Sequence, residues 1–335
     1  MESNDSKTGE NTKTRIEWLD VVKGMAIVIV VLGHASELPW RLRQLIFLVH
    51  MPVFFMTSGM VYKIKAAKYD LKRLIVPYII TAAFIFVFRE IAILRGYYYC
   101  YESRSQLIRA ILYGSGASHN NNVMIGEIWY LLALFWSKRI LDSATLLDTE
   151  RLRAGLILSI CAAGLYLSMH DIWLPLSVDV AFVSCVFVYA GAVLRKNIAL
   201  LLEPRFMWGA AIVFGADIYC GYCELAARNY TPWVLAIPGA IAGSILLMRF
   251  SMEVCKVTML KRVFQYFGKH TLLFLCIHSL DWRLPIPRPG INLISALYNT
   301  PYYWFGDFVT RFVFDLLATI VISEFIGLCK RMKTR

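Results

Sequence analysis

Charge is scarce in this sequence. Only 17% of its 335 residues are Asp, Glu, Lys or Arg, whereas 58% are hydrophobic. So small a polar fraction excludes a water-soluble globular fold and indicates a protein that crosses a membrane several times. A net charge of +12 would suggest nucleic acid as the partner of a soluble chain. In a membrane protein, basic residues instead set the orientation of the spans, so no nucleic acid is expected.

Motifs of several common functions are also missing. There is no glycine-rich phosphate loop ending in lysine, which argues against the use of ATP. Cys220 and Cys223 form a Cys-x-x-Cys pair without a second pair, and His119 and His170-Asp171 lie in predicted loops without cysteine or carboxylate at ligand spacing, so no metal is expected. No small-residue cleavage site follows the first apolar segment, so no cleavable signal peptide is expected.

What the sequence has in abundance is apolar stretches long enough to cross a membrane as helices, which takes about 20 residues. Ten such stretches lie at residues 21–38, 45–62, 74–94, 123–141, 155–170, 173–194, 206–223, 231–248, 263–281 and 304–328. We therefore predict an all-α, polytopic membrane protein with about ten transmembrane helices. Residues 15–335 are expected to form a single transmembrane domain with no separate soluble domain, and the polar residues 1–14 a disordered tail.

Lysine and arginine are unevenly divided between the two sides that these spans define. The side with the N-terminus carries 24 of the 35, the opposite side carries eight, and three fall within spans. Positive residues stay on the cytoplasmic side of membrane proteins. Both termini are therefore predicted to be cytoplasmic, in an inner (plasma) membrane. Lys63, Lys65 and Lys68, in one cytoplasmic loop, suit contacts with lipid headgroups.

The first two spans contain ionisable groups. Lys23 stands near the start of the first span, and His34 follows eleven residues later, ~16 Å further along one helix. Asp20, three residues before Lys23, can pair with it on the same helix face. His50 lies in the second span. Because ionisable groups are costly inside a bilayer, each is a functional candidate.

Further polar residues share one half of the predicted spans with the histidines. With the orientation above, His34, His50 and His278 all fall in the outer half. The same half contains Arg89, Glu90, Glu127, Asp179, Asp307 and Arg311. Contact with lipid would be unfavourable for all of them, so they are expected to face a shared interior.

The spacing of the first motifs is specific. An aromatic-Leu-Asp sequence precedes Lys23-Gly24, ten residues separate Lys23 from His34, and the second span reads His50-x-Pro52-x-Phe54-Phe55-x-x-Ser58-Gly59. This pattern, over roughly 45 residues, resembles the membrane-bound acyltransferase-3 family. Shorter likenesses follow at Arg73 with Pro77-Tyr78, at Trp129-Tyr130-Leu131, and from Gly268 to His278.

The resemblance implies a function. Members of that family typically move acetyl groups from acetyl-CoA to sugars of cell-surface or secreted glycans, so it implies acetyl-CoA as the acyl donor and a glycan or lipid-linked sugar as the acceptor. Family histidines at the position of His34 are regarded as catalytic. Imidazole, with a pKa of about 6.5 in water, suits the removal of a proton from a sugar hydroxyl that attacks a thioester.

Residues can be assigned to roles on this basis. The predicted catalytic residues are His34 as general base, Glu90 or Asp179 to orient it, and His50, Ser58 or Arg89 as donors to a developing oxyanion. The phosphates of the donor are expected at Lys23, Lys72 and Arg73, with Ser58 nearby. The acceptor is expected to contact Arg89, Glu127, His278 and Arg311.

Other interpretations of the same residues stay open. A lone buried histidine is more often structural than catalytic. A secondary transporter or exporter of a glycan or small anion is the alternative function, since intramembrane Arg, Asp and His mark transport paths as readily as catalytic sites. The absence of an internal repeat argues against it. The residues do not distinguish acetyl from succinyl as the acyl group, nor direct transfer from an acyl-histidine intermediate.

Overall fold

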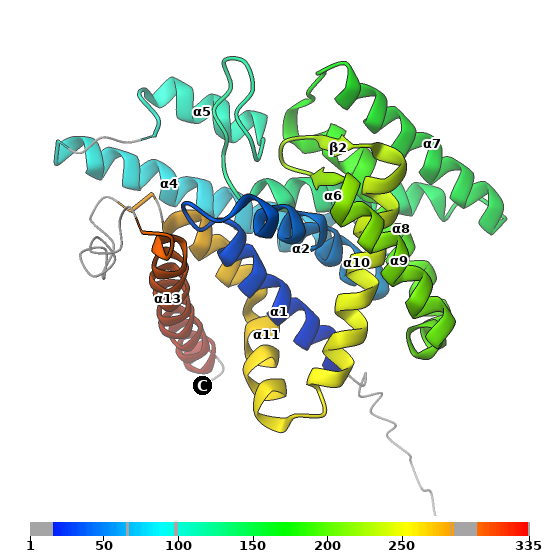
Figure 1. Ribbon diagram of the computed structural model, residues 1–335. Helices are drawn as coiled ribbons and strands as arrows, with labels where there is room; N and C mark the ends of the chain where they lie inside the picture. The colour runs from blue at the N-terminus through cyan, green and yellow to red at the C-terminus, as the bar shows by residue number, and fades with distance from the viewer. Residues whose placement is uncertain (1–15, 65–66, 97–99, 282, 285–299, 334–335) are drawn as a thin grey trace, which may run out of the picture.

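The computed structural model describes residues 16–64, 67–96, 100–281, 283–284 and 300–333. The predicted N-terminal tail, residues 1–14, lies outside the described residues. Most of the described chain is helical (Figure 1).

The elements follow one another along the chain in a simple order. They are α1 (Glu17–Gly33), α2 (Trp40–Met60), α3 (Ala67–Asp70), a π-helical segment (Leu71–Ile75), α4 (Val76–Leu94), α5 (Arg104–Tyr113), α6 (Trp129–Ala144), α7 (Glu150–Met169), a 3-10 turn (Pro175–Ser177), α8 (Val178–Lys196), a second 3-10 turn (Ile198–Leu202), α9 (Pro204–Cys220), β1 (Tyr222–Glu224), β2 (Asn229–Thr231), α10 (Trp233–Val254), α11 (Thr258–Asp281) and α13 (Tyr303–Lys333). The two strands form an antiparallel hairpin in which Cys223 faces Tyr230.

Each of the ten predicted spans coincides with a helix. Six helical segments of the described chain are long and apolar enough to cross a membrane: α2, the segment 67–94, α7, the segment 175–196, α10 and α13. Helices α1, α6 and α9 have 17, 16 and 17 residues, and α11 is longer but carries several charges. The prediction of a helical membrane protein is thus confirmed, whereas the number of spans stays a prediction.

Helix ends differ from the predicted span ends at two places that matter for function. The first span was expected to continue to residue 38, but α1 ends at Gly33 and His34 is its C-terminal cap. Glu37 then adopts a positive φ of 56°, which no helix permits. The fourth span was expected from residue 123, but α6 begins at Trp129. His34 and Glu127 therefore both lie just outside helices.

Helices α1 and α11 run side by side through the middle of the bundle (Figure 1). Their backbones touch, because a Cβ atom on Gly24 would collide with the carbonyl of Phe264 and one on Gly268 with the carbonyl of Asp20. Small residues at helix interfaces allow this close approach in membrane proteins. The glycines of two motifs thus bring the helices together.

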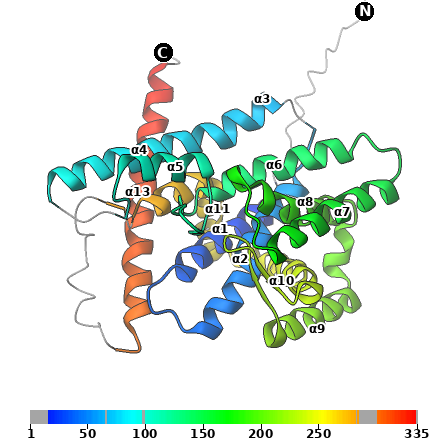
Figure 2. The same cartoon turned by 90° about the horizontal axis from the view of Figure 1, so that it is seen from above.

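A second pair of helices, α2 and α8, makes the same kind of contact. A Cβ atom on Gly59 would meet the backbone of Val188, and one on Gly191 would meet that of Met56. Helices α6, α7, α9 and α10 pack outside this centre. Figure 2 shows α13 at the opposite edge of the bundle from α7 and α9. Side chains on its outer face, such as Val313, Leu317 and Phe325, are exposed, as suits contact with lipid.

Candidate active site

Two cavities lie along α1 and α2. The first, which we call the Lys23 cavity, has a volume of about 240 Å³. The second, the His34 cavity, has a volume of about 520 Å³. On α1, Lys23 and Ile27 line the first cavity, and Val30 and His34 line the second. These positions are three or four residues apart, so one face of the helix serves both cavities.

The same holds for α2. Its residues along one face line first the His34 cavity and then the Lys23 cavity: Arg43, Phe47 and His50, then Phe54, Ser58 and Val61. The two motifs of the sequence therefore form one continuous wall. Its ends differ in chemistry, with Lys23 at one end and the imidazoles of His34 and His50, together with Arg43, at the other.

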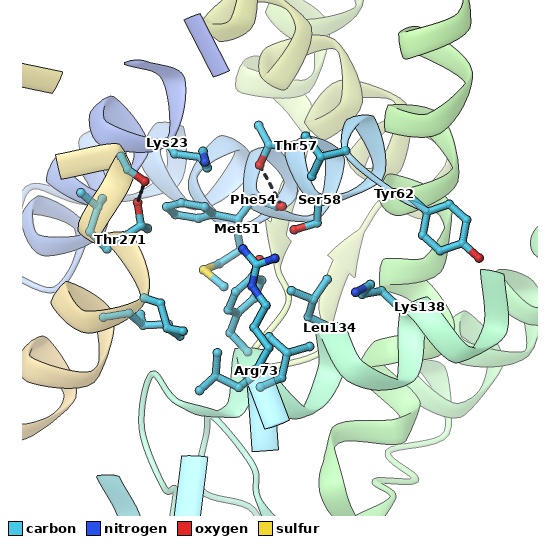
Figure 3. Close-up of a pocket in the computed structure, with 18 of the residues that line it drawn as sticks. Lys23, Met51, Phe54, Thr57, Ser58, Tyr62, Arg73, Leu134, Lys138 and Thr271 are labelled. Carbon is cyan, nitrogen blue, oxygen red and sulfur yellow. Dashed lines mark hydrogen bonds between the residues drawn. The ribbon is translucent and has the colours of Figure 1, made fainter. Parts of the chain in front are cut away.

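Basic side chains converge on the Lys23 cavity. Figure 3 shows Lys23, Arg73 and Lys138 entering it from α1, from the π-helical segment and from α6. The predicted pair on α1 is confirmed, since the Lys23 Nζ atom lies 2.8 Å from the Asp20 carboxylate. Lys138 is ion-paired with Asp70. Ser58 also lines this cavity, but Lys72 does not.

The three histidines of the sequence prediction meet at the other end. The ring of His34 lies 6.3 Å from that of His50 and 5.5 Å from that of His278, between centroids. His34 Nδ1 is 2.8 Å from the carbonyl oxygen of Val30, and His50 Nδ1 is 2.9 Å from that of Ile46. A carbonyl only accepts, so each Nδ1 carries the proton. Each neutral ring therefore presents Nε2 as an acceptor.

His278 is held by a carboxylate instead of a carbonyl. Its Nδ1 donates to Asp315 Oδ2 at 2.7 Å, and both side chains are fully buried. The Nε2 atom of His278 has no hydrogen-bond partner among the described residues. His278 does not line either cavity but lies directly behind His34.

Glu127 is the carboxylate beside His34. Its Oε1 atom lies 3.8 Å from His34 Nε2, and its Oε2 atom lies 3.8 Å from Arg283 Nη1. Both oxygens are thus near cationic or potentially cationic groups. A carboxylate at this distance stabilises an imidazolium that forms on His34.

Arg311 links α13 to the same cluster. It lines the His34 cavity, and it is bound to Asp281 at 3.1 Å and to Asp307 at 3.0 Å. Asp307 also accepts a hydrogen bond of 2.8 Å from the backbone of Ser36, just beyond α1. The loop after His34 is thereby fixed to α13.

Of the described residues, one group has donor atoms close enough to hold a metal ion. These are the side chains of His278, Asp281 and Asp315, whose ligand atoms lie within 4.8 Å of one another. Arg311 already supplies a positive charge to Asp281. A divalent cation here would be repelled by the guanidinium, so the ion pairs account for the cluster.

Sequence reasoning missed Asp281 and Asp315. Asp315 falls inside the predicted span 304–328, and Asp281 ends the span 263–281. The rule that marked Asp307, an ionisable residue in an apolar span, applies equally to Asp315. The partnership with His278 joins residues that are 37 positions apart, and no sequence pattern indicates it.

Glu90 and Asp179 are placed elsewhere than predicted. Glu90 is bound to Arg89 at 2.6 Å and to Arg104 at 2.7 Å. Asp179 is buried against Arg228, whose Nε lies 2.9 Å from Oδ2. Arg89 of α4 and Arg104 of α5 neutralise Glu90, and Arg228 of the loop between β1 and β2 neutralises Asp179. Glu127 is therefore the carboxylate that lies beside His34. Arg89 also donates to the carbonyls of Tyr101 and Glu102 at 3.1 and 3.0 Å, and so fixes the loop after α4.

A cluster of loop residues stands near the His34 cavity. His119 Nε2 donates to Asp171 at 2.9 Å, which lowers the pKa of Asp171, and its ring stacks on Trp173 at 4.3 Å. These partners were not expected from their spacing in sequence. Residues 116–118, just before His119, line the cavity, so the cluster holds that part of its wall in place.

Comparisons with known proteins agree with the likeness of the motifs. The chain matches the family model described as an acyltransferase domain over residues 16–326. No curated protein and no solved structure matches it. The matched region runs from the residue before α1 to the last turns of α13 and includes both cavities. The chain therefore belongs to the acyltransferase-3 family.

Proposed function

We propose that this acyltransferase moves an acetyl group from cytoplasmic acetyl-CoA to a hydroxyl of a cell-surface or lipid-linked glycan, with His34 as general base. The observation that carries the proposal is the continuous wall of α1 and α2, with Lys23, joined by Arg73 and Lys138 from other elements, at one end and His34 at the other. Such a wall suits a donor whose phosphates and thioester are far apart.

The Lys23 cavity suits the phosphate end of the donor. Lysine and arginine bind phosphate oxygens through charge-assisted hydrogen bonds. Lys23, Arg73 and Lys138 line the cavity together with Lys63 and Lys269. The excess of basic residues on the N-terminal side of the spans supports a cytoplasmic opening, where acyl-CoA is available.

The reaction follows from the tautomer of His34. The acceptor hydroxyl oxygen attacks the thioester carbonyl carbon while its proton passes to His34 Nε2. Glu127, 3.8 Å away, stabilises the imidazolium. The C–S bond then breaks, and the proton moves from His34 to the departing sulfur, so that a glycan ester and free CoA thiol are formed. In this proposal Arg311, which also lines the cavity, donates to the developing oxyanion.

The residues predicted to donate hydrogen bonds to the oxyanion, His50, Ser58 and Arg89, do not have that role in this proposal. Neutral His50 uses its Nδ1 proton on Ile46, so its other nitrogen accepts rather than donates. Ser58 lines the Lys23 cavity and not the His34 cavity. Arg89 is committed to loop carbonyls and Glu90.

The His34 cavity has the size and lining for a sugar. It is the larger of the two cavities, and its walls combine Trp129 with polar groups such as Ser118 and Glu224. Aromatic faces and hydrogen-bonding side chains are the usual contacts of a carbohydrate.

Turnover of acetyl-CoA by the purified protein in proteoliposomes tests the proposal. The protein should release CoA thiol and transfer radiolabelled acetyl to an extract of lipid-linked glycans, and neither product should form without the extract. Movement of label or glycan across the membrane without release of CoA thiol would instead identify a transporter.

A further inference from the structure

The two cavities meet at two side chains. Of the described residues, Met51 of α2 and Leu275 of α11 line both the Lys23 cavity and the His34 cavity, and every other lining residue belongs to one. Both are buried, with exposed fractions of 7% and 5%. They therefore form the partition between the cavities.

This partition stands where the thioester has to come. Met51 directly follows His50, which lines the His34 cavity, and it precedes by three residues Phe54, which lines the Lys23 cavity. Leu275 lies one helical turn before His278, whose ring is 5.5 Å from that of His34. An acyl group that reaches His34 from the Lys23 cavity therefore passes the two residues that line both cavities, Met51 and Leu275.

The apolar side chains of the partition favour some acyl groups over others. Neither side chain carries a hydrogen-bonding group that would satisfy a polar acyl substituent, and a carboxylate is costly to desolvate without a partner. Methionine has three rotatable bonds and yields to a small group, whereas each further methylene requires more room. The partition thus admits a methyl group and opposes longer or charged acyl chains.

We propose that Met51 and Leu275 determine which acyl group is transferred, in favour of acetyl over longer or carboxylated groups. The proposal rests on the proposed function, since it supposes that the donor enters from the Lys23 cavity. It concerns specificity and not the chemical step.

Donor selectivity of purified variants tests the partition. Met51→Ala and Leu275→Ala should raise the ratio of kcat/KM for butyryl-CoA over acetyl-CoA by at least about tenfold, the effect of one methylene in an apolar pocket. Neither variant should accept succinyl-CoA appreciably better, because the enlarged opening stays apolar. Leu275→Val removes a single methylene, a change mild enough to preserve the fold, and should raise the same ratio several-fold.

Met56→Ala is the matched control. Met56 lies on the same helix and is fully buried, but it does not line either cavity. Its replacement should leave the ratio unchanged. An equal rise in Met56→Ala would mean general loosening and would overturn the assignment, as would an unchanged ratio in both Leu275 variants while the wild type transfers acetyl. Absence of turnover with any acyl-CoA would overturn the proposed function itself, and this inference with it.

Discussion

The two ends of α1 are fixed in the bundle by different means. Near Lys23, backbone lies against backbone, since Gly24 touches Phe264 and Gly268 touches Asp20. Near His34 the helix has ended, and the contacts are the hydrogen bond from Ser36 to Asp307 of α13, the carboxylate of Glu127 from the loop before α6, and the ring of His278 from α11. The Lys23 end is held mainly by shape, in addition to the largely exposed ion pair of Glu17 with Lys261 of α11, and the His34 end mainly by charge.

This difference indicates how each end of α1 should respond to amino-acid substitutions. Removal of the partly exposed Lys23 side chain leaves the backbone contacts that hold the helices in place, although it takes away the ion-pair partner of the buried Asp20. At the His34 end, removal of one charged group leaves its buried partner uncompensated. Substitutions at the Lys23 end should therefore change acetyl-CoA binding more than catalysis. At the His34 end, a test of catalysis requires replacements that preserve polarity.

The largest effect is expected at His34. Both His34→Ala and His34→Asn should reduce turnover by ~10²–10⁴, the usual contribution of a positioned acid or base, while the binding of acetyl-CoA is retained. Turnover and acetyl-CoA binding are to be measured together with thermal stability in detergent. Asparagine keeps a polar group near Glu127 but takes up no proton. Substantial activity in His34→Asn would rule out the role of His34 as base.

The close contact of α1 and α11 should give the next largest effect. Gly24→Ala places a methyl group against the Phe264 carbonyl and should destabilise the protein by about 1–3 kcal/mol, the usual cost of overpacking. Gly209→Ala is the control, because a Cβ atom at Gly209 in α9 meets nothing within 4 Å, so stability should be unchanged or slightly raised. Thermal unfolding in one detergent compares them, and equal losses would contradict the shape argument.

A smaller effect is expected from the basic groups. Lys23→Ala should raise KM for acetyl-CoA several-fold and leave kcat nearly unchanged, because contacts with phosphate are equally strong in the ground and transition states. The side chain is about one third exposed, which limits the gain from each contact. Lys72→Ala is the control, since Lys72 does not line the cavity. A fall in kcat at constant KM would move Lys23 to the chemical step.

Lys23 and Lys72 also illustrate what the sequence could predict. Apolar length and the spacing of Lys23, His34 and His50 are local properties, and the helices, the pair of Lys23 with Asp20 and the family assignment followed from them. Which of several neighbouring basic residues faces the cavity depends on the π-helical segment at 71–75, which turns Arg73 inward. No periodicity indicated that segment.

The partners of His34 could not be predicted for a different reason. Glu90 or Asp179 was predicted to orient His34, and Glu127 to contact the acceptor, because the distances between these carboxylates and His34 were unknown. Arg104 of α5 and Arg228 of the loop between β1 and β2, 14 and 49 residues away, bind Glu90 and Asp179. Glu127 reaches His34 because α6 begins six residues later than the predicted span. Such choices depend on how loops fold over the helices, which span lengths do not specify.

The smallest effect is expected from the loop cluster, where an exposed ion pair should matter less than the buried ones. His119→Ala removes the partner of Asp171 and loosens residues 116–118 in the wall of the His34 cavity. It should raise KM for the glycan acceptor by about twofold, in keeping with the weakness of exposed ion pairs, with KM for acetyl-CoA unchanged. The loss in thermal stability should be smaller than that of Gly24→Ala.

The loss of thermal stability in His119→Ala should depend on pH in a definite direction. His119 lowers the pKa of Asp171 in the folded protein, so the stabilisation is complete above the unfolded value of about 3.9 and disappears as the pH falls through the lowered folded value. Thermal unfolding of wild type and His119→Ala, compared from pH 7 to pH 3, should therefore show two curves that converge on the acid side. A difference that stays constant down to pH 3 would mean that His119 stabilises the loop through its stacking on Trp173 and not through Asp171.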